Sequence, residues 1–255
     1  MENVCYKSVM IKAIFLDMDD TLIVNQVLFE NATFLLCGYL RHFGVLQAEA
    51  EEVFSRIDKE NFKTHGYSRT RLPSSFEQTL RHFVPNADEE MVSIARGFAE
   101  DVFTANAPLK PGVDEAVKIL SQRYRLYIVT AGDESVQSHR YANNIPFQDK
   151  IGKVFIVPKK DKCVYETVLA ELGLKPDEAV MIGDSLKSDV IPATEAGMQA
   201  VWVEAHNSQH ESAAGFPPSR AYKASSLIEA AERLVRRGTP APRIGRAFPK
   251  PRRTR

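Results

Sequence analysis

The chain has 255 residues, of which 44% are hydrophobic and 26% are charged, and its formal net charge at pH 7 is zero. This composition is typical of a globular protein with a large core, and the length allows one large domain or a domain that carries an insertion. No apolar run reaches the length of a membrane span, and the first ten residues contain no signal-peptide core, so we expect a cytoplasmic protein without a membrane partner.

The cysteines argue against both a disulfide framework and a zinc site. Cys5, Cys37 and Cys163 lie far apart, with neither CxxC spacing nor nearby histidines. An odd number of scattered cysteines is typical of reduced thiols. We therefore expect free thiols, with Cys37 in the core.

The first apolar run, residues 11–16, predicts a buried strand that is followed at once by two carboxylates. Asp17 and Asp19 leave the strand end in similar directions and repel each other unless a proton or a cation neutralises one of them. Open α/β sheets bind their ligands at this end of the strands. One such carboxylate can attack phosphorus while the other exchanges protons with the leaving oxygen and with water. The alternative is an acidic turn capped by Thr21, without chemistry.

A helical block is expected next. Apolar residues recur at three- and four-residue spacing in the segments 27–43, 48–64, 74–83 and 88–103. Between the second and third segments lies a basic stretch in which Arg69 and Arg71 are candidates for contacting an anionic part of a substrate. An exposed connection between helices explains these arginines equally well, and we prefer that interpretation.

Beyond the turn at residues 108–112, helices and short strands are expected to alternate. The expected strands are 126–129, 154–157, 179–182 and 200–203, and the expected helices lie near 113–121, 134–143, 162–172 and 188–196. This alternation predicts an α/β fold in which a parallel sheet has helices on both faces. The first strand must join that sheet, so the helical block becomes an insertion after it.

Two of the later strands are expected to end in groups that suit a phosphate. Thr130 and Gly132 follow the second strand, where a hydroxyl and free backbone N–H groups can cradle phosphate oxygens; a helix N-cap is the alternative. Lys159 and Lys160 follow the third strand, where a lysine can neutralise an attacking carboxylate and the phosphoryl oxygens. The alternative is a solvated cluster of charges.

The fourth strand is expected to end in a third carboxylate. Asp184 follows this strand directly, and Asp189 lies five residues further on, near the start of the next helix. Asp189 alone is explained as a helix-capping acid. Asp184 is harder to explain in that way, because three carboxylates at strand ends are costly without a hard cation that accepts their oxygens.

In chain order, these groups resemble the four motifs of the haloacid dehalogenase superfamily, from residue 11 to about residue 205. The motifs are Asp-x-Asp-x-Thr at 17–21, a threonine after the second strand, a lysine after the third, and Gly-Asp-x4-Asp at 183–189. The resemblance implies a Rossmann-like, doubly wound parallel core with an inserted α-helical cap, which is subclass I. The core is then expected at 1–21 and 109–235, and the cap at 22–108.

The resemblance also implies roles for residues at matching positions. Asp17 would be the nucleophile and Asp19 the acid and base. Thr130 and the Ala131 amide would bind the phosphoryl group, and Lys160 would be the active-site lysine, with Lys159 as the reserve choice. The Mg²⁺ ligands would be Asp17, Asp184 and the Asp19 carbonyl, and Asp189 would support the metal or the lysine. Two positions depart from the common pattern. Pro158 precedes the lysines and no proline follows them, and Ala131 stands where many relatives carry asparagine or lysine.

The resemblance implies a Mg²⁺-dependent phosphatase that hydrolyses small phosphorylated metabolites through an aspartyl-phosphate. Asp19 argues against a true dehalogenase, which resembles this pattern but lacks the second carboxylate and needs no magnesium. Two alternatives stay open. One is a phosphotransferase such as a sugar-phosphate mutase, and the other is a non-catalytic binding protein that uses a basic tail.

That tail is residues 236–255, which contain eight basic residues and no acidic one. Its prolines and glycines favour disorder over a packed element. It contains no folded nucleic-acid-binding motif, so nonspecific electrostatic attraction is favoured over a nucleic-acid partner. The sequence predicts no oligomeric state.

Overall fold

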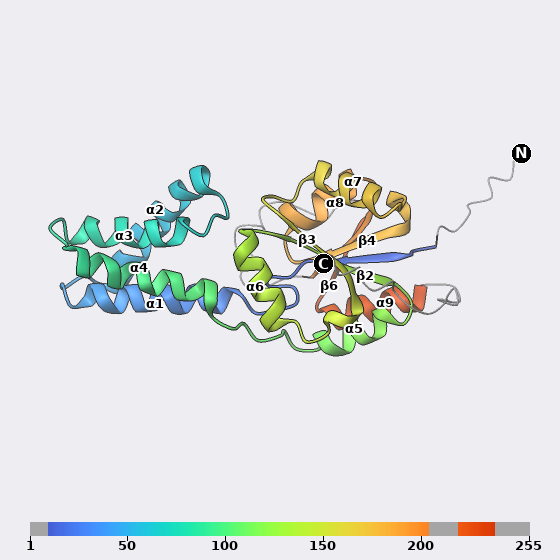
Figure 1. Ribbon diagram of the computed structural model, residues 1–255, viewed down its shortest axis with the longest axis horizontal. Coiled ribbons are helices and arrows are strands. Elements are labelled where there is room, and N and C mark those ends of the chain that lie inside the picture. Colours follow the sequence, from blue (N-terminus) through green and yellow to red (C-terminus); the bar gives the residue numbers. More distant parts are fainter. Residues whose placement is uncertain (1–9, 204–218, 238–255) are drawn as a thin grey trace, which may run out of the picture.

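A computed structural model describes residues 10–203 and 219–237 of the chain. Figure 1 shows two parts, a sheet with helices on both faces and a separate bundle of helices beside it. No helix of the described residues is long and apolar enough to cross a membrane.

The sheet has six parallel strands within the described residues, in the order β3-β2-β1-β4-β5-β6. The strands are β1 (Ala13–Leu16), β2 (Arg125–Ala131), β3 (Ile151–Val157), β4 (Ala179–Gly183), β5 (Gln199–Val203) and β6 (Ala221–Ala224). All four residues of β1 are fully buried, as expected for a central strand covered on both faces. The chain moves outward from β1 in one direction and then from β4 in the other, which confirms the predicted doubly wound α/β fold.

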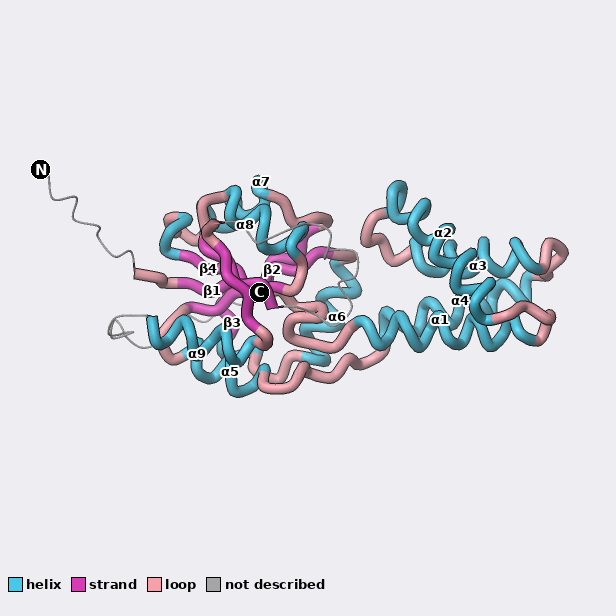
Figure 2. Tube along the Cα trace, turned by 180° about the vertical axis from the view of Figure 1, so that it is seen from behind, coloured by secondary structure: helices cyan, strands magenta, loops and turns pink. Residues whose placement is uncertain are grey.

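Helices cover the two faces of the sheet and build two cores (Figure 2). On one face, α5 (Val113–Ser121) and α9 (Leu227–Arg237) pack against Ile14 and Leu16. On the other face, α7 (Lys162–Glu171) and α8 (Ile191–Glu195) pack against Phe15. Successive side chains of a strand point to opposite faces, which is why β1 contributes to both cores. The remaining short elements are 3₁₀ turns at Gln148–Lys150 and Pro176–Glu178 and a π-helical turn at Leu186–Val190.

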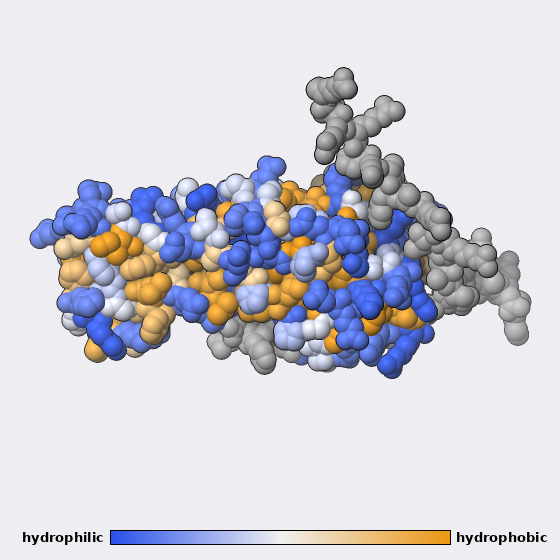
Figure 3. All heavy atoms as spheres, turned by 60° about the horizontal axis from the view of Figure 1, so that its bottom comes forward, coloured by the Kyte–Doolittle hydropathy of each residue, from blue (hydrophilic) through white to orange (hydrophobic). Residues whose placement is uncertain are grey.

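The bundle contains α1 (Gln26–Arg41), α2 (Gln47–His65), α3 (Arg71–Phe83) and α4 (Glu89–Thr104). Its core includes Leu36, Leu40, Phe76 and Leu80, all fully buried, and Cys37 is buried with them as a free thiol, as predicted. Apolar side chains also remain on the surface of the bundle (Figure 3), and Phe34, Leu35 and Leu46 are among the most exposed.

The bundle joins the sheet through two chain segments that lie side by side. The Val24 amide donates to the Pro108 carbonyl at 2.8 Å, and the Lys110 amide donates to the Leu22 carbonyl at 2.8 Å. Asp20 stands at the start of this junction in the left-handed backbone region, with φ +56°. Its carboxylate accepts the Asn25 and Gln26 amides at 2.9 Å each and so anchors the start of α1.

The α6 helix (Glu134–Asn144) lies between the two parts, in contact with both β3 and α4. Asp133 caps its first turn by accepting the Ser135 amide at 3.0 Å. The helix follows β2 directly, so it begins at the carboxyl edge of the sheet. Its first two turns therefore face the ends of the neighbouring strands.

The C-terminal part of the sheet differs from expectation. The core was expected to continue to residue 235, but no strand or helix was named in it after residue 203, where the structure has β6 and α9. Arg236 pairs with Glu232 at 3.0 Å within α9, which ends at Arg237, two residues beyond the expected end of the core. A four-residue edge strand is too short to give a clear alternating pattern, which explains why β6 was missed. Residues 238–255 lie outside the described residues.

The bundle core generates a stability prediction. Phe76 is fully buried and meets Phe54 edge to face, with ring centroids 5.2 Å apart. We expect Phe76→Ala to lower the free energy of unfolding by about 3–5 kcal/mol, because it removes apolar contacts and leaves a cavity. Phe34→Ala is the matched control, since Phe34 is 66% exposed. Urea denaturation of both variants checks this, and equal losses would contradict it.

Candidate active site

Side chains from four strand ends meet at one edge of the sheet. Asp17 follows β1, Thr130 lies near the end of β2, Lys160 follows β3 and Asp184 follows β4. The carboxyl ends of parallel strands share one edge, so residues far apart in the chain become neighbours. A cavity of about 1010 Å³ lies between this edge and the helical bundle, and all four residues line it.

Lys160 is buried at the base of this cavity. Only 6% of the residue is exposed, its Nζ lies 2.6 Å from Asp17 Oδ1, and it also pairs with Asp189. Burial alone would lower the pKa of this ammonium, but the charges of Asp17 and Asp189 outweigh burial and hold it well above its ordinary value. Lys159, the reserve choice, is exposed. The structure therefore brings Lys160, and not Lys159, to the carboxylates.

Asp17, Asp184 and Asp189 form an acidic cluster whose carboxylate oxygens lie within 4.8 Å of one another. Burial raises the pKa of Asp184 well above its ordinary value, and the charges of Asp17 and Asp189 add to the shift. Thr21 joins two of these acids, because its hydroxyl lies 3.1 Å from Asp17 Oδ2 and 3.2 Å from Asp184 Oδ1. One lysine does not neutralise three carboxylates, so the cluster suits a hard cation that prefers oxygen ligands.

Asp189 holds Lys160 through a buried ion pair. It is fully buried, one oxygen is paired with Lys160, and the other accepts the Ser185 amide at 3.0 Å. Burial raises its pKa to about 7 against the opposing charge of Lys160. Gly183 makes room for it, since a Cβ at that position would lie 2.2 Å from Asp189 Oδ2. With both oxygens engaged, Asp189 is better placed to orient Lys160 than to bind a metal.

The carboxyl end of β2 presents an unpaired hydroxyl to the cavity. Thr130 is 1% exposed, and within the described residues its Oγ1 has no hydrogen-bond partner. A buried hydroxyl without a partner is costly, and an oxygen of a bound phosphate would satisfy it. Ala131 and Gly132 line the cavity next to it, and Gly132 adopts a φ of +152°. A side chain at Gly132 would meet Gln137 Nε2 at 2.7 Å, so the turn requires glycine.

Asp19 is held from α6 by two residues that sequence reasoning missed. Its Oδ2 accepts Gln137 Nε2 at 2.8 Å and Arg140 Nη1 at 2.9 Å. Burial raises the pKa of Asp19, and the Arg140 charge and the Gln137 hydrogen bond oppose that rise. The only sequence signal was the three-residue spacing of two polar residues in an expected helix, which is equally typical of a solvated face. Thr21 was recognised as part of the first motif and as a possible cap, but its contacts with Asp17 and Asp184 were not predicted.

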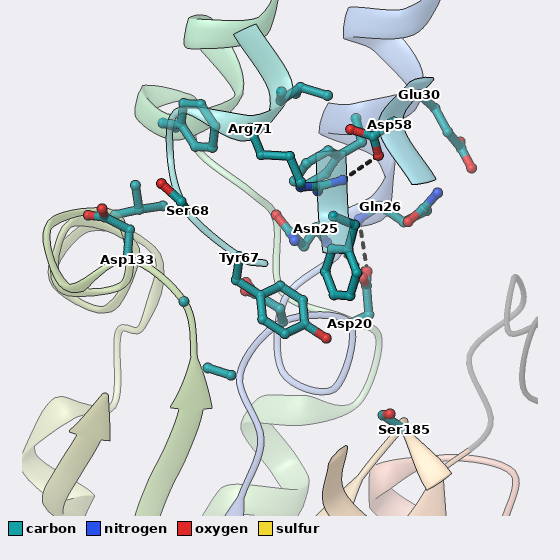
Figure 4. Close-up of a pocket in the computed structure, with 18 of the residues that line it drawn as sticks. Asp20, Asn25, Gln26, Glu30, Asp58, Tyr67, Ser68, Arg71, Asp133 and Ser185 are labelled. Carbon is teal, nitrogen blue, oxygen red and sulfur yellow. Dashed lines mark hydrogen bonds and ion pairs between the residues drawn. The ribbon is translucent and has the colours of Figure 1, made fainter. Parts of the chain in front are cut away.

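The bundle supplies the outer wall of the cavity, including the aromatic residues Phe29, Phe54, Phe62 and Tyr67. Figure 4 shows the Tyr67 ring entering the cavity from the connection between α2 and α3 and Arg71 directed at Asp58. Asp58 thus neutralises the charge of Arg71. The Arg69 guanidinium lies 5.8 Å from the centre of the Phe103 ring. The exposed connection preferred from the sequence fits Arg69, which lies exposed in the turn before α3. It does not fit Arg71, which lies in α3, lines the cavity and has a side chain only 15% exposed.

The buried lysine generates a second prediction. We expect Lys160→Met to lower the free energy of unfolding by about 3–5 kcal/mol, because it leaves Asp17 and Asp189 buried without their counter-charge. Lys159→Met removes the same charge one residue away, at an exposed position, and we expect it to change stability by less than about 0.5 kcal/mol. Chemical denaturation in metal-free buffer measures both. Similar losses in the two variants would show that the ion pairs do not stabilise the fold.

Comparisons with known proteins identify the family to which this arrangement of residues belongs. The family model described as haloacid dehalogenase-like hydrolase matches residues 11–197, well over half of the chain. A glyceraldehyde 3-phosphate phosphatase of Methanopyrus kandleri is 29% identical over 203 residues, which are 75% of this chain and 83% of that protein. A pyrimidine 5'-nucleotidase of Streptococcus pneumoniae is 22% identical over 234 residues, which are 88% of this chain and 96% of that protein.

The fold is shared with solved structures as well. A haloacid dehalogenase-like family hydrolase from Xanthomonas campestris superimposes with a TM-score of 0.74 at 22% identity, covering 89% of this chain and 92% of that one. The family model spans all four strand-end motifs, from Asp17 to Asp189. The chain therefore belongs to the haloacid dehalogenase-like hydrolases.

Proposed function

We propose that the protein is a Mg²⁺-dependent phosphatase that hydrolyses small phosphate monoesters through an aspartyl-phosphate on Asp17. One observation carries this proposal, the position of the Asp17 carboxylate at the cavity base, where it pairs with Lys160 and belongs to the acidic cluster. A nucleophile, a buried cation for phosphoryl oxygens and an excess of carboxylates thus meet at one sheet edge. Two of the relatives support it, because one is named a glyceraldehyde 3-phosphate phosphatase and the other a pyrimidine 5'-nucleotidase.

The reaction divides into two displacements at phosphorus. In the first, an oxygen of Asp17 forms a bond to phosphorus while the bond to the leaving oxygen breaks, and Asp19 donates a proton to that oxygen. In the second, Asp19 takes a proton from water, and the water oxygen displaces Asp17 to release phosphate. Lys160 and the Thr130 hydroxyl bind phosphoryl oxygens during both displacements.

The metal ligands we propose are Asp17, Asp184 and the backbone carbonyl of Asp19. These are hard oxygen donors of the kind that Mg²⁺ prefers. Burial raises the pKa of Asp184 and the charges of Asp17 and Asp189 add to the rise, so a cation beside these acids would stabilise the ionised carboxylate. A bound Mg²⁺ would neutralise charge on the phosphoryl group. Asp189 is excluded from this set because Lys160 and the Ser185 amide occupy its oxygens.

The domain assignment is part of the same proposal. Residues 22–108 would act as a cap over a core formed by 1–21 and 109–235, and movement at the paired segments near Leu22 and Lys110 would control the entry of substrate and water. Substrate choice would then depend on the aromatic residues that the bundle contributes to the cavity. A cytoplasmic location fits a metabolite phosphatase with free thiols at Cys37 and Cys163.

Phosphate release from p-nitrophenyl phosphate tests this function. We expect release that needs Mg²⁺, stops with EDTA and falls by about 10³-fold or more in Asp17→Asn, since the amide is a poor nucleophile. Asp149→Asn is the control, because the Asp149 side chain is 74% exposed and we expect full activity.

Three outcomes would contradict the proposal. Equal rates with Mg²⁺ and with EDTA would show that the reaction does not need the metal. Equal rates for wild type and Asp17→Asn would show that Asp17 is not the nucleophile. Release of nitrophenol without stoichiometric phosphate would indicate transfer to a second acceptor, as in a mutase.

A further inference from the structure

The hydrogen bonds to Asp19 come from buried side chains. Gln137 is 2% exposed and Arg140 is 3% exposed, and both donate to the same oxygen, Asp19 Oδ2. A buried arginine is rare unless it is paired, and within the described residues Asp19 is the acid with which Arg140 forms an ion pair. Two donors that converge from one helix restrict both rotation and translation of the carboxylate.

Gln137 also ties Asp19 to the turn after β2. Its Nε2 donates to the Ala131 carbonyl at 2.8 Å as well as to Asp19 Oδ2 at 2.8 Å. One amide group thus connects the end of β2, next to Thr130, with the carboxylate that follows β1. The side chain fits there because Gly132 has no Cβ to obstruct it.

The arrangement leaves the other oxygen of Asp19 unengaged. Asp19 Oδ1 has no hydrogen-bond partner among the described residues, while Oδ2 accepts two. A carboxylate that is fixed through one oxygen can exchange a proton through the other. Fixing a reacting group before the reaction lowers the entropic cost of reaching the transition state.

We propose that Gln137 and Arg140 are positioning residues that hold the Asp19 carboxylate for proton transfer to the leaving oxygen. The inference rests on the proposed function, because it presupposes that Asp19 is the acid. It assigns the two α6 residues a role through Asp19 rather than in contact with the phosphoryl group. Loss of either residue should therefore matter most for substrates whose leaving group needs a proton.

Two substrates of similar shape separate this role from a structural one. The p-nitrophenolate ion leaves readily without a proton, whereas phenolate depends more on one. We define the discrimination ratio as kcat/KM for p-nitrophenyl phosphate divided by kcat/KM for phenyl phosphate. This ratio reports the steps through departure of the leaving group, and it does not change with the fraction of folded enzyme.

We expect Arg140→Met to raise the discrimination ratio about tenfold, in the same direction as Asp19→Asn, since positioned acid catalysis contributes about 10²- to 10⁴-fold. Arg140→Lys keeps the charge with a smaller donor group and should give an intermediate ratio. Arg125→Met should leave the ratio unchanged, because Arg125 is an exposed arginine at the start of β2, remote from the carboxyl edge of the strand. Gln137→Leu is the second test should Arg140→Met fail to fold, and we expect the same direction of change.

The outcomes separate the inference from the function on which it rests. If wild type hydrolyses neither substrate, the proposed function fails. If wild type hydrolyses both substrates and Arg140→Met or Gln137→Leu lowers the two kcat/KM values by the same factor, the discrimination ratio does not change. The positioning role is then overturned, while the proposed function stands. An unchanged ratio in Asp19→Asn would overturn it as well, because Asp19 would then not be the acid.

Discussion

The site depends on one buried lysine between two carboxylates. Lys160, Asp17 and Asp189 come from segments that follow β3, β1 and β4, and all three are almost completely buried. A buried charge without a partner is strongly destabilising, so these segments must keep their relative positions for the fold to persist. Asp184 adds a third carboxylate, and the resulting excess of negative charge suits a divalent cation at the same place.

The chemistry is divided between a rigid edge and an attached bundle. The edge of the sheet supplies Lys160 and the acidic cluster, whereas the bundle supplies the aromatic wall of the cavity. The α6 helix connects the two, because it contacts both β3 and α4 and also holds Asp19. A single helix thus links the orientation of the Asp19 carboxylate to the packing between sheet and bundle, which gives α6 a larger part in the site than its polar sequence indicates.

The fold class could be predicted from the sequence because it depends on patterns among neighbouring residues. Short apolar strands alternating with helices predicted the parallel sheet, and β1, β2 and β4 appear within a few residues of the expected bounds. Chemistry-bearing residues stood directly after those strands, so their meeting at one edge followed from the topology. The pattern was less informative where elements are short, as at β6, and it indicated no helix at the position of α9.

Sequence alone determined the family, the α/β fold and the acids at the strand ends, since strand periodicity and strand-end position are properties of neighbouring residues. Only the tertiary structure decided that Lys160 rather than Lys159 meets the carboxylates, that Thr21 joins Asp17 to Asp184, and that α6 holds Asp19. These contacts join residues 143, 163, 118 and 121 positions apart in the chain. Which polar side chain is buried against which partner depends on packing between distant segments, and no local pattern encodes it.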